Sequence, residues 1–375
     1  MANLTRYPDK IRVLYLVLEM ELGGLQRIVK LLIDKLDREK FIPYLCCLDN
    51  GGFFYDQLEN NLLKAYILQR KPGPFDIGLL VRLYKILREN KIDIIHSQSG
   101  CMVYAALAGR LARVKRIVHT DHGRFKPDKR SIMLEEWISS KVIHHVIGVS
   151  HELTEYLALQ VKIKRKKLLT IINGVDTHKF IPMHSERRNK LKKKYGLNEE
   201  VKVLGTICRL DPVKNLEFLI SCLPSICEKV TECRLLIVGD GPCRERLIKH
   251  AESLGIDSKI SFTGAMSDVD NVLPAFDVYV CTSLSEGTSM TILEAMSCGL
   301  PVVASAVGGN SSLVDESNGR LFPLNDADVF KRSVIELLED EELRKQTGQE
   351  GRNKIEKNYD FDNVVRQYEK LYSSF

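Results

Sequence analysis

The sequence predicts an α/β protein made of two Rossmann-like domains that face each other across a cleft. Apolar runs of strand length recur along both halves, each followed by a helical pattern, and this alternation favours parallel strands with right-handed crossovers. The chain has 375 residues, enough for two domains of ordinary size. A polar and basic stretch between about Asn173 and Glu200 separates the two series.

The first half opens with a near-continuous aliphatic run, Ile11–Leu18, which suits a strand buried on both faces. Gly23 and Gly24 follow, and then apolar residues at helical spacing as far as Leu36. The further strands predicted in this half are Ile42–Leu48, Ile92–His96, Arg116–Thr120, His145–Val149 and Leu168–Ile172. The further predicted helices are Leu79–Asn90 and Val103–Ala112.

The second half repeats the plan. The predicted strands are Val201–Ile207, Arg234–Val238, Lys259–Phe262, Val278–Cys281 and Val302–Ala304. The predicted helices are Asn215–Cys227, Arg244–Leu254, Met290–Ser297 and Val329–Leu338. Because ligands bind beyond the carboxyl ends of parallel strands, the loops after the strands are where we expect the chemistry.

Composition restricts the class of protein. No run of about 18 apolar residues suggests a membrane span, and the N-terminal residues lack the apolar segment of a secretory signal. The ten cysteines are scattered without CxxC spacing, which argues against zinc and disulfides. We therefore expect a cytoplasmic protein with reduced, mostly buried thiols.

The net charge of +6 is unevenly distributed: residues 1–200 carry +14 and residues 201–375 carry −8. Two basic runs, Lys162–Lys167 and Arg187–Lys194, contribute much of the excess. They are interpreted as a solvated face near the interdomain connection. The alternative is attraction to anionic lipid headgroups, worth about 1 kcal/mol per basic residue. Nucleic acid is disfavoured, because no aromatic residues interleave the runs.

Two glycine-containing loops follow predicted strands. Gly23 and Gly24 open a helix whose first N–H groups could meet an anion, and a tight turn with positive φ is the equal alternative. Gly239, in the segment Val238–Pro242, lies where a ligand could approach the backbone. This segment is not GxGxxG and lacks the acidic residue that binds a nicotinamide ribose, so a dehydrogenase is disfavoured.

Two charged groups follow the strand that ends at Ile207. Arg209 and Lys214 lie on one loop and could bind a diphosphate together. On this segment alone, a surface ion pair with Asp211 is the better explanation. The most informative segment is Ser283–Val303, where Glu286 and Glu294 flank a predicted helix start. Such a start favours a phosphate, and a glutamate one turn inside could bind a ribose diol.

These motifs together resemble the retaining GT-B glycosyltransferases of glycosyltransferase family 4, also described as glycosyl transferases group 1. The segment from Glu286 to Val303 resembles the E-x7-E signature of that family. Six other segments agree in order: Gly23–Arg27, Thr120–Gly123, Val149–Ser150, Asn173–Asp176, Cys208–Lys214 and Val238–Pro242. Two departures are Cys208 and Asn215, which stand where the family commonly has glycine.

The resemblance implies a role for each matched residue. Arg209 and Lys214 would hold the donor diphosphate, and Glu286 would contact hydroxyls of the transferred sugar. His122 would lie by the 6-position of the sugar, and these four are the implied catalytic residues. Glu294 would bind the ribose. The other implied donor-binding residues are Gly23, Gly24, Gly239, Gly264, Met266, Gly287, Thr288, Met290 and Thr291.

The resemblance also implies a division of labour between domains. Residues 1–180 would form an N-terminal acceptor-binding domain, on which a C-terminal helix of about residues 358–375 would pack. Residues 181–357 would bind the nucleotide sugar. The two acidic residues of Asp268–Asp270 have the spacing of a metal-binding DxD motif, but helix capping explains them better, so no metal and no cofactor are expected.

The implied activity is transfer of a hexose or N-acetylhexosamine to a glycan, lipid-linked or small-molecule acceptor. A UDP-sugar is favoured over a GDP-sugar as the donor. The context would be cell-surface polysaccharide or glycolipid synthesis, with peripheral contact at the cytoplasmic face of an anionic membrane. The alternatives are a sugar-nucleotide 2-epimerase and a non-catalytic scaffold of a polysaccharide assembly.

Overall fold

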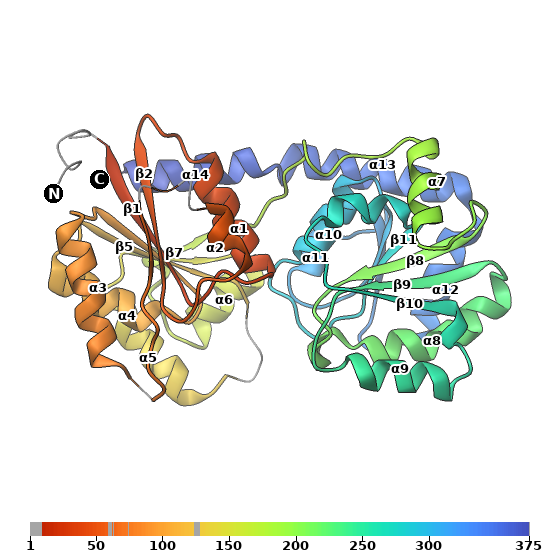
Figure 1. Cartoon of the computed structure of the whole chain (residues 1–375), viewed down its shortest axis with the longest axis horizontal. Coiled ribbons are helices and arrows are strands. Elements are labelled where there is room, and N and C mark those ends of the chain that lie inside the picture. The colour runs from red at the N-terminus through yellow and green to blue at the C-terminus, as the bar shows by residue number, and fades with distance from the viewer. Residues whose placement is uncertain (1–9, 59–61, 63, 74, 124–127, 375) are drawn as a thin grey trace. The chain divides into compact units, whose positions relative to one another are not determined.

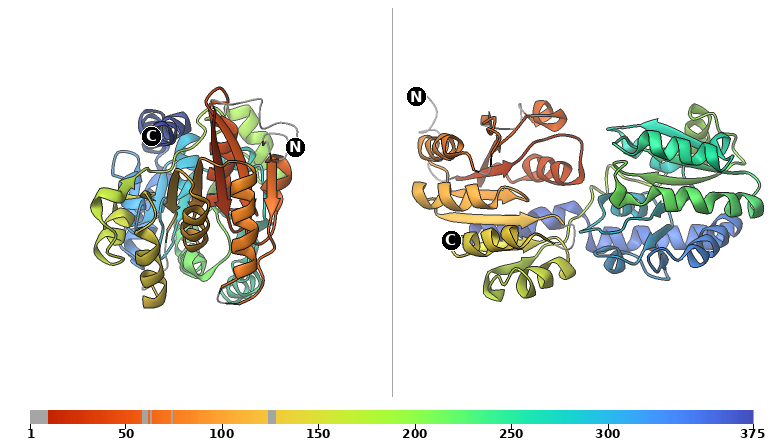
Figure 2. Two further views of the ribbon diagram at one scale, coloured as in Figure 1. Left: turned by 90° about the vertical axis from the view of Figure 1, so that its left-hand side faces the viewer. Right: turned by 90° about the horizontal axis from the view of Figure 1, so that it is seen from below.

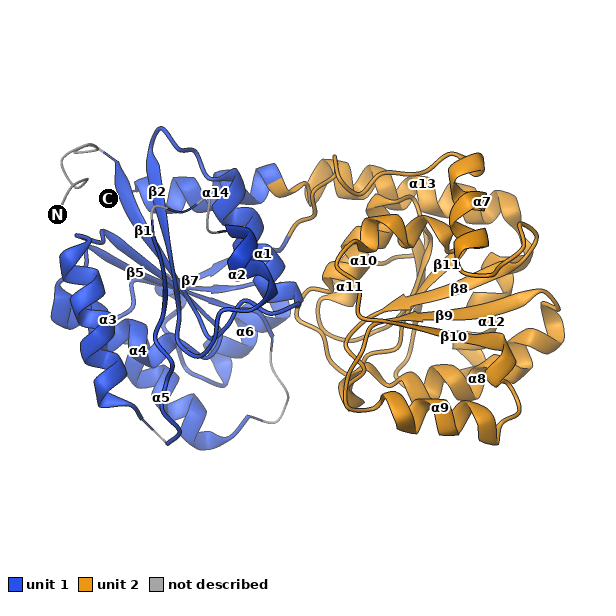
Figure 3. Ribbon diagram, viewed as in Figure 1, with its two compact units in different colours: residues 1–173, 362–375 blue, residues 174–361 orange. Residues whose placement is uncertain are grey.

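The computed structural model describes residues 10–58, 62, 64–73, 75–123 and 128–374. The chain divides into two compact units (Figure 3): unit 1 is residues 1–173 with 362–375, and unit 2 is residues 174–361. Each unit is a parallel β-sheet with helices on both faces (Figures 1 and 2). The predicted α/β class is confirmed.

Unit 1 has a seven-stranded sheet in the order β3-β2-β1-β4-β5-β6-β7. Its strands are β1 Ile11–Val17, β2 Phe41–Cys47, β3 Lys64–Ile67, β4 Ile94–Gln98, β5 Arg116–Asp121, β6 His145–Gly148 and β7 Leu168–Thr170. Its helices are α1 Gly24–Lys35, α2 Phe53–Leu58, α3 Ile77–Glu89, α4 Met102–Ala112, α5 Arg130–Ser140, α6 His151–Leu159 and α14 Phe361–Ser373, which begins at the last residue of unit 2. The strand order reverses between β1 and β4, where such sheets bind ligands.

The core of unit 1 follows from the period-two alternation of β1. Leu14 and Leu16 belong to the cluster under α3, α4 and α6. Tyr15 lies on the other face with α14, where it accepts a hydrogen bond from the hydroxyl of Tyr372 at 3.4 Å. The same hydroxyl lies 2.5 Å from Nδ1 of the buried His96, so α14 is fastened to unit 1 by polar as well as apolar contacts.

Unit 2 has a six-stranded sheet in the order β10-β9-β8-β11-β12-β13, which reverses between β8 and β11. Its strands are β8 Lys202–Ile207, β9 Cys233–Val238, β10 Ile260–Gly264, β11 Val278–Cys281, β12 Val302–Ser305 and β13 Gly319–Phe322. Its helices are α7 Ser185–Lys194, α8 Leu216–Lys229, α9 Arg244–Ser253, α10 Met290–Ser297, α11 Asn310–Leu313, α12 Ala327–Glu339 and α13 Glu341–Asn358.

Both basic runs contain residues that are structural rather than solvated. Lys192 is only 3% exposed, and its Nζ lies 3.2 Å from Oδ2 of Asp277, which also accepts from Arg188 at 2.6 Å through Oδ1. Lys167 donates to the carbonyl oxygens of Ser140 at 2.7 Å and of Ile143 at 2.6 Å. The interpretation of the runs as purely solvated faces is therefore wrong for these three basic residues.

The remaining expectations concern thiols, metals and membranes. All ten cysteines are free thiols, and seven of them are buried. Asp268 precedes a short 3₁₀ helix, Val269–Asn271, but its side chain makes no capping bond, and Asp270 pairs with Lys179 at 3.2 Å. In the described part of the chain, no three His, Cys, Asp or Glu side chains form a metal-binding group. No helix there is long and apolar enough to cross a membrane.

Candidate active site

The loops after β8 and β11 meet at the point where the sheet of unit 2 reverses its order. Nζ of Lys214, from the first loop, lies 2.6 Å from Oε1 of Glu286, from the second. The hydroxyl of Ser283 donates to the same oxygen at 2.7 Å. Two of the predicted site residues, 72 positions apart in sequence, thus form one ion pair.

Lys214 is positioned by the backbone of both loops. It ends a 3₁₀ helix, Pro212–Lys214, and Asn215 after it has a left-handed backbone with φ 53°. Asparagine tolerates this conformation better than most residues, which explains why it can stand where the family commonly has glycine. The hydroxyl of Thr282 donates to the carbonyl of Lys214 at 2.9 Å, and the amide of Leu284 donates to the carbonyl of Val213 at 2.8 Å.

The charge on Lys214 is maintained by its partner. Burial disfavours the ammonium group, but the Glu286 carboxylate outweighs burial and raises the pKa of Lys214 above its ordinary value. Lys214 is therefore a cation at neutral pH. An ammonium group has three N–H donors, so it can keep Glu286 and still bind a phosphate oxygen.

The backbone of Glu286 and Gly287 rests on two glycines that the sequence analysis did not single out. A Cβ atom at Gly308 would lie 1.9 Å from the carbonyl oxygen of Glu286, and one at Gly309 would lie 1.9 Å from that of Gly287. Asn310, directly after them, is fully buried and donates to the carbonyl of Ser305 at 3.1 Å. The only sequence signal for this support is the Gly-Gly pair after β12.

Helix α10 begins directly after this loop. Its N-cap, Ser289, accepts from the amide of Ile292 at 3.4 Å, which leaves the amides of Met290 and Thr291 outside the capping bond. Thr288 and Met290 are buried, and Glu294 is fully buried in the second turn. The Tyr279 hydroxyl donates to Oγ1 of Thr291 at 2.6 Å and so ties the helix to β11.

The first glycine after β9 has a structural role that the sequence does not indicate. Gly239 has φ 140°, and a Cβ atom there would lie 1.8 Å from the carbonyl oxygen of Cys208. Beyond it, the amide of Leu210 donates to the carbonyl of Asp240 at 2.9 Å. Gly239 is therefore required for the approach of the loop after β8, on which Arg209 lies. The Gly239 amide also donates to the carbonyl of Gly264 at 2.9 Å.

Arg209 and Met266 complete the predicted set of unit 2. The side chain of Arg209 is 72% exposed and pairs with Asp211 at 3.1 Å, the ion pair that the simpler alternative expects. Arg209 thus lies on the loop of Lys214 but outside its ion pair. Met266 follows β10, where its Sδ accepts from the hydroxyl of Tyr195 at 3.9 Å.

In unit 1, His122 lies directly after β5 and is held from two sides. Its Nε2 lies 2.8 Å from Oε1 of Gln98, at the end of β4, and its amide donates to the hydroxyl of Ser99 at 2.9 Å. Burial, with Asp121 opposing it, lowers the pKa of His122 to about 4. The imidazole is neutral at pH 7, and because the Gln98 oxygen only accepts, the ring proton is on Nε2.

Gly23 and Gly24 lie at the exposed start of α1, after β1. Gly23 is extended, with φ −167°, so the alternative of a positive-φ turn is wrong for it. The first amides of any helix have no partner within the helix, so this end remains suited to an anion. Arg124 and Lys126, which follow His122 in the sequence, lie outside the described residues.

Comparison with known proteins identifies the family. The model of glycosyl transferases group 1 matches residues 187–354, and that of Glycosyltransferase Family 4 matches residues 22–179. A UDP-Gal:alpha-D-GlcNAc-diphosphoundecaprenol alpha-1,3-galactosyltransferase from Escherichia coli is 31% identical over 97% of this chain and 96% of its own. The chain belongs to glycosyltransferase family 4, the glycosyl transferases group 1.

Other similar proteins agree with this family and fold. An N-acetyl-alpha-D-glucosaminyl L-malate synthase from Bacillus anthracis is 26% identical over 80% of this chain and 79% of its own. The crystal structure of Anabaena HepE in complex with UDP-glucose superposes with a TM-score of 0.87 at 22% identity, covering 97% of this chain and all of that one. The fold is accordingly GT-B, as the resemblance implied.

Each unit contains contacts to its own predicted site residues that the sequence did not reveal. Ser283 and Gln98 bind the side chains of Glu286 and His122, and Gly308 and Gly309 support the Glu286 loop. Ser283 and Gln98 are polar residues at or just after the carboxyl end of a parallel strand, which is the signal that would have found them.

Proposed function

We propose that this glycosyltransferase moves a hexose or N-acetylhexosamine from a nucleotide diphosphate sugar with retention of anomeric configuration and without a metal ion. The observation that carries the proposal is the Lys214–Glu286 ion pair at the carboxyl edge of the unit 2 sheet, just before α10. Lys214 keeps its positive charge and can bind a diphosphate, and the carboxylate of Glu286 can bind a sugar.

The cations act on the leaving group. Lys214, Arg209 and the first amides of α10 neutralise charge as the nucleotide diphosphate departs, which is the work a metal ion does in other transferases. We do not assign either glutamate of the site, Glu286 or Glu294, as a covalent nucleophile. Departure and attack on the same face of an oxocarbenium-like sugar is the course we propose, with a phosphate oxygen taking the acceptor proton.

Glu286 and His122 bind the sugar in this proposal. Both Lys214 and Ser283 bind Oε1 of Glu286, so Oε2 can accept from a sugar hydroxyl. The neutral His122 holds its proton on Nε2 toward Gln98, so its Nδ1 can accept another hydroxyl. Glu294 binds the ribose diol; the nine smaller donor contacts implied by the resemblance are proposed with it.

The donor and acceptor classes follow the relatives' names. The E. coli relative is named for UDP-Gal and for a GlcNAc-diphosphoundecaprenol acceptor, which supports a UDP-sugar and a lipid-linked acceptor. A human component of phosphatidylinositol N-acetylglucosaminyltransferase, 28% identical over 77% of this chain and 59% of its own, is also named for a lipid acceptor. We propose a role in cell-surface polysaccharide or glycolipid synthesis at the cytoplasmic face of a membrane.

Thermal shift with UDP, GDP, ADP and NAD tests the donor site. A nucleoside diphosphate at about 100 times its Kd should stabilise the protein by about 2.7 kcal/mol, with UDP giving the largest shift. Glu294→Gln keeps the shape of the buried side chain and should lose most of the shift, whereas Lys249→Gln on α9 should keep it. No shift with any nucleoside diphosphate would favour the scaffold alternative.

Product analysis tests the reaction. With UDP-sugar and a lipid-linked acceptor, NMR of the product should show the donor's anomeric configuration, and EDTA should leave the rate unchanged. Incubation without acceptor should leave the sugar nucleotide intact. Conversion to the 2-epimer would indicate the epimerase instead.

A further inference from the structure

Helix α5 of unit 1 turns its apolar residues to solvent. Leu134, Trp137 and Ile138 are 56%, 37% and 55% exposed, although their i, i+3, i+4 spacing is that of a packing stripe. The buried residues of this helix are two serines, Ser139 and Ser140. This is the reverse of a helix that packs its apolar stripe on a sheet.

The neighbouring helix extends the apolar surface. Helix α4 packs between α3 and α5, and its Leu107 and Leu111, one turn apart, are 42% and 60% exposed. We call the exposed surface of Leu107, Leu111, Leu134, Trp137 and Ile138 the α4–α5 face. Contiguous exposed apolar residues of this kind mark an interaction site more often than isolated ones do.

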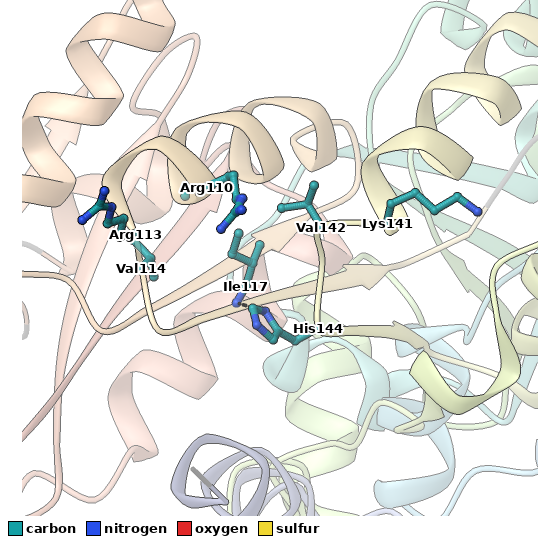
Figure 4. A pocket seen from close by; sticks show the side chains of 8 residues that line it. Arg110, Arg113, Val114, Ile117, Lys141, Val142 and His144 are labelled. Carbon is teal, nitrogen blue, oxygen red and sulfur yellow. Dashed lines mark hydrogen bonds between the residues drawn. The ribbon is translucent and has the colours of Figure 1, made fainter.

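One end of the α4–α5 face is a basic pocket of about 330 Å³ (Figure 4). Arg110 reaches it from the last turn of α4 and Arg113 directly follows that helix, and Lys141 and His144 come from the segment after α5. Lys141 also lies on the apolar stripe, with its Nζ 3.8 Å from the centre of the Trp137 ring.

The pocket is built on fixed backbone. Nδ1 of His144 accepts from the amide of Ile117 at 3.0 Å. Lys167 donates to the carbonyls of Ser140, Lys141 and Ile143 and so holds the chain that leaves α5. Arg110 therefore faces the pocket beside an apolar stripe, and the side chains of Arg113 and Lys141 extend to either side of it (Figure 4).

We propose that the α4–α5 face docks on an anionic lipid bilayer. The apolar residues enter the boundary between headgroups and acyl chains, with Trp137 at the depth that tryptophan prefers. Headgroup phosphates bind Arg110, Arg113 and Lys141 along the edge of the face. A second copy of the chain fits less well, because a two-fold contact would bring together two faces that carry the same basic residues.

This inference deepens the proposed function, since it names the surface by which an enzyme with a lipid-linked acceptor would reach it. It places the contact on α4 and α5 rather than on the basic runs. The nucleotide site lies in other residues, so UDP binding and vesicle binding can be measured independently on the same full-length protein.

Trp137 is the only tryptophan in the chain, so its fluorescence reports on the α4–α5 face alone. Vesicles of phosphatidylglycerol and phosphatidylcholine should shift its emission to shorter wavelength and carry the protein in flotation. Lipids brominated on the acyl chain should quench the emission. Pure phosphatidylcholine vesicles should bind far less.

Two variants test the two parts of the surface. Arg110→Gln/Arg113→Gln should bind about 30-fold more weakly, since each basic residue contributes about 1 kcal/mol near an anionic surface. Leu134→Gln/Ile138→Gln should lose the quenching by brominated lipid. The control Lys229→Gln/Lys249→Gln removes two exposed charges from unit 2 and should bind like wild type.

Binding of the arginine double variant equal to that of the control would overturn the inference. So would a lipid-free blue shift that grows with protein concentration, which would indicate self-association. A response to inorganic phosphate without any to vesicles would make the pocket a site for free anion and would overturn it as well. An intact UDP shift alongside absent vesicle binding would refute this inference and leave the proposed function standing.

Discussion

Lys214→Met separates the catalytic role of the ion pair from its structural role. The substitution keeps an unbranched apolar chain but removes the ammonium that lies 2.6 Å from Glu286. Glu286 keeps the hydrogen bond from Ser283, so its carboxylate is not left without a donor. The variant should fold.

The structural cost can be estimated from exposure. The side chains of Lys214 and Glu286 are 24% and 12% exposed, so the pair is neither fully buried nor screened like a surface pair. Breaking a fully buried pair costs about 3–5 kcal/mol and a surface pair at most about 1 kcal/mol. We expect a loss of about 2 kcal/mol, or about 4–8 °C in Tm.

The catalytic cost is larger. Removing one preorganised group that stabilises developing charge lowers kcat by about 10²–10³, the equivalent of about 2.7–4 kcal/mol. The assay is UDP release from a UDP-sugar with acceptor, alongside UDP affinity by titration. Lys214→Met should lose both turnover and affinity for UDP.

Glu286→Gln is the matched partner variant. It frees Lys214 from its carboxylate, so affinity for UDP should be kept or increased while turnover falls, because the contact with the transferred sugar is weakened. Equal losses of UDP affinity in both variants would refute the assignment of Lys214 to the diphosphate and Glu286 to the sugar. Near-wild-type turnover of Lys214→Met would refute the site.

Three further predictions concern the supports of the site. Gly239→Ala should destabilise by about 3–5 kcal/mol in urea unfolding, because its Cβ would meet the Cys208 carbonyl, whereas Gly264→Ala, with φ 80° but open space around it, should cost only about 1–2 kcal/mol. Asp277→Asn should cost about 3–5 kcal/mol by leaving Lys192 buried without its anion. Burial would raise the pKa of Asp277, but Arg188 and Lys192 hold that pKa below its ordinary value. The contribution of Asp277 to stability should therefore be lost as the pH falls below about 4. Because the pKa of His122 is lowered to about 4, its contribution to stability is complete above pH 6.5 and is lost as the pH falls toward 4. His122→Gln should reduce the slope of that part of the Tm profile, to which the buried His96 also contributes, and Lys249→Gln on α9 should leave it unchanged.

The elements that sequence predicted best are those whose own residues determine them. The strand Val278–Cys281 and the helix Met290–Ser297 have the predicted bounds, because the first is a short apolar run and the second has a serine N-cap. The edge strands β3 and β13 were missed, since each has only four residues and a mixed burial pattern.

Helix α13 was missed for a different reason. Its contact with α10 is made by glycines rather than by an apolar stripe: a Cβ atom at Gly348 would lie 2.0 Å from the carbonyl oxygen of Gly299. A close approach of two backbones leaves no hydrophobic period to detect. The position of this helix therefore depends on a partner that the local sequence does not reveal.

The site shows the same limit. That Glu286 and Lys214 bind each other depends on β8 and β11 being adjacent, and no local pattern encodes that adjacency. The residue types on each loop were predictable, because charged side chains and glycines after parallel strands indicate anion chemistry. Which residue each charged side chain would pair with was not predictable from the sequence.

The Lys214–Glu286 pair also explains how the charges of the site are stabilised before a donor binds. Burial disfavours a lone ammonium at this depth without removing its charge, and a lone carboxylate would repel the incoming diphosphate. Paired with Glu286, the Lys214 ammonium keeps its charge and the local field is near neutral. When a diphosphate binds the remaining N–H donors of Lys214, the pair does not have to break, so little reorganisation opposes binding. In the proposed mechanism, the charge that stabilises the leaving group is therefore already in place, oriented by Thr282 and Ser283, before the sugar arrives.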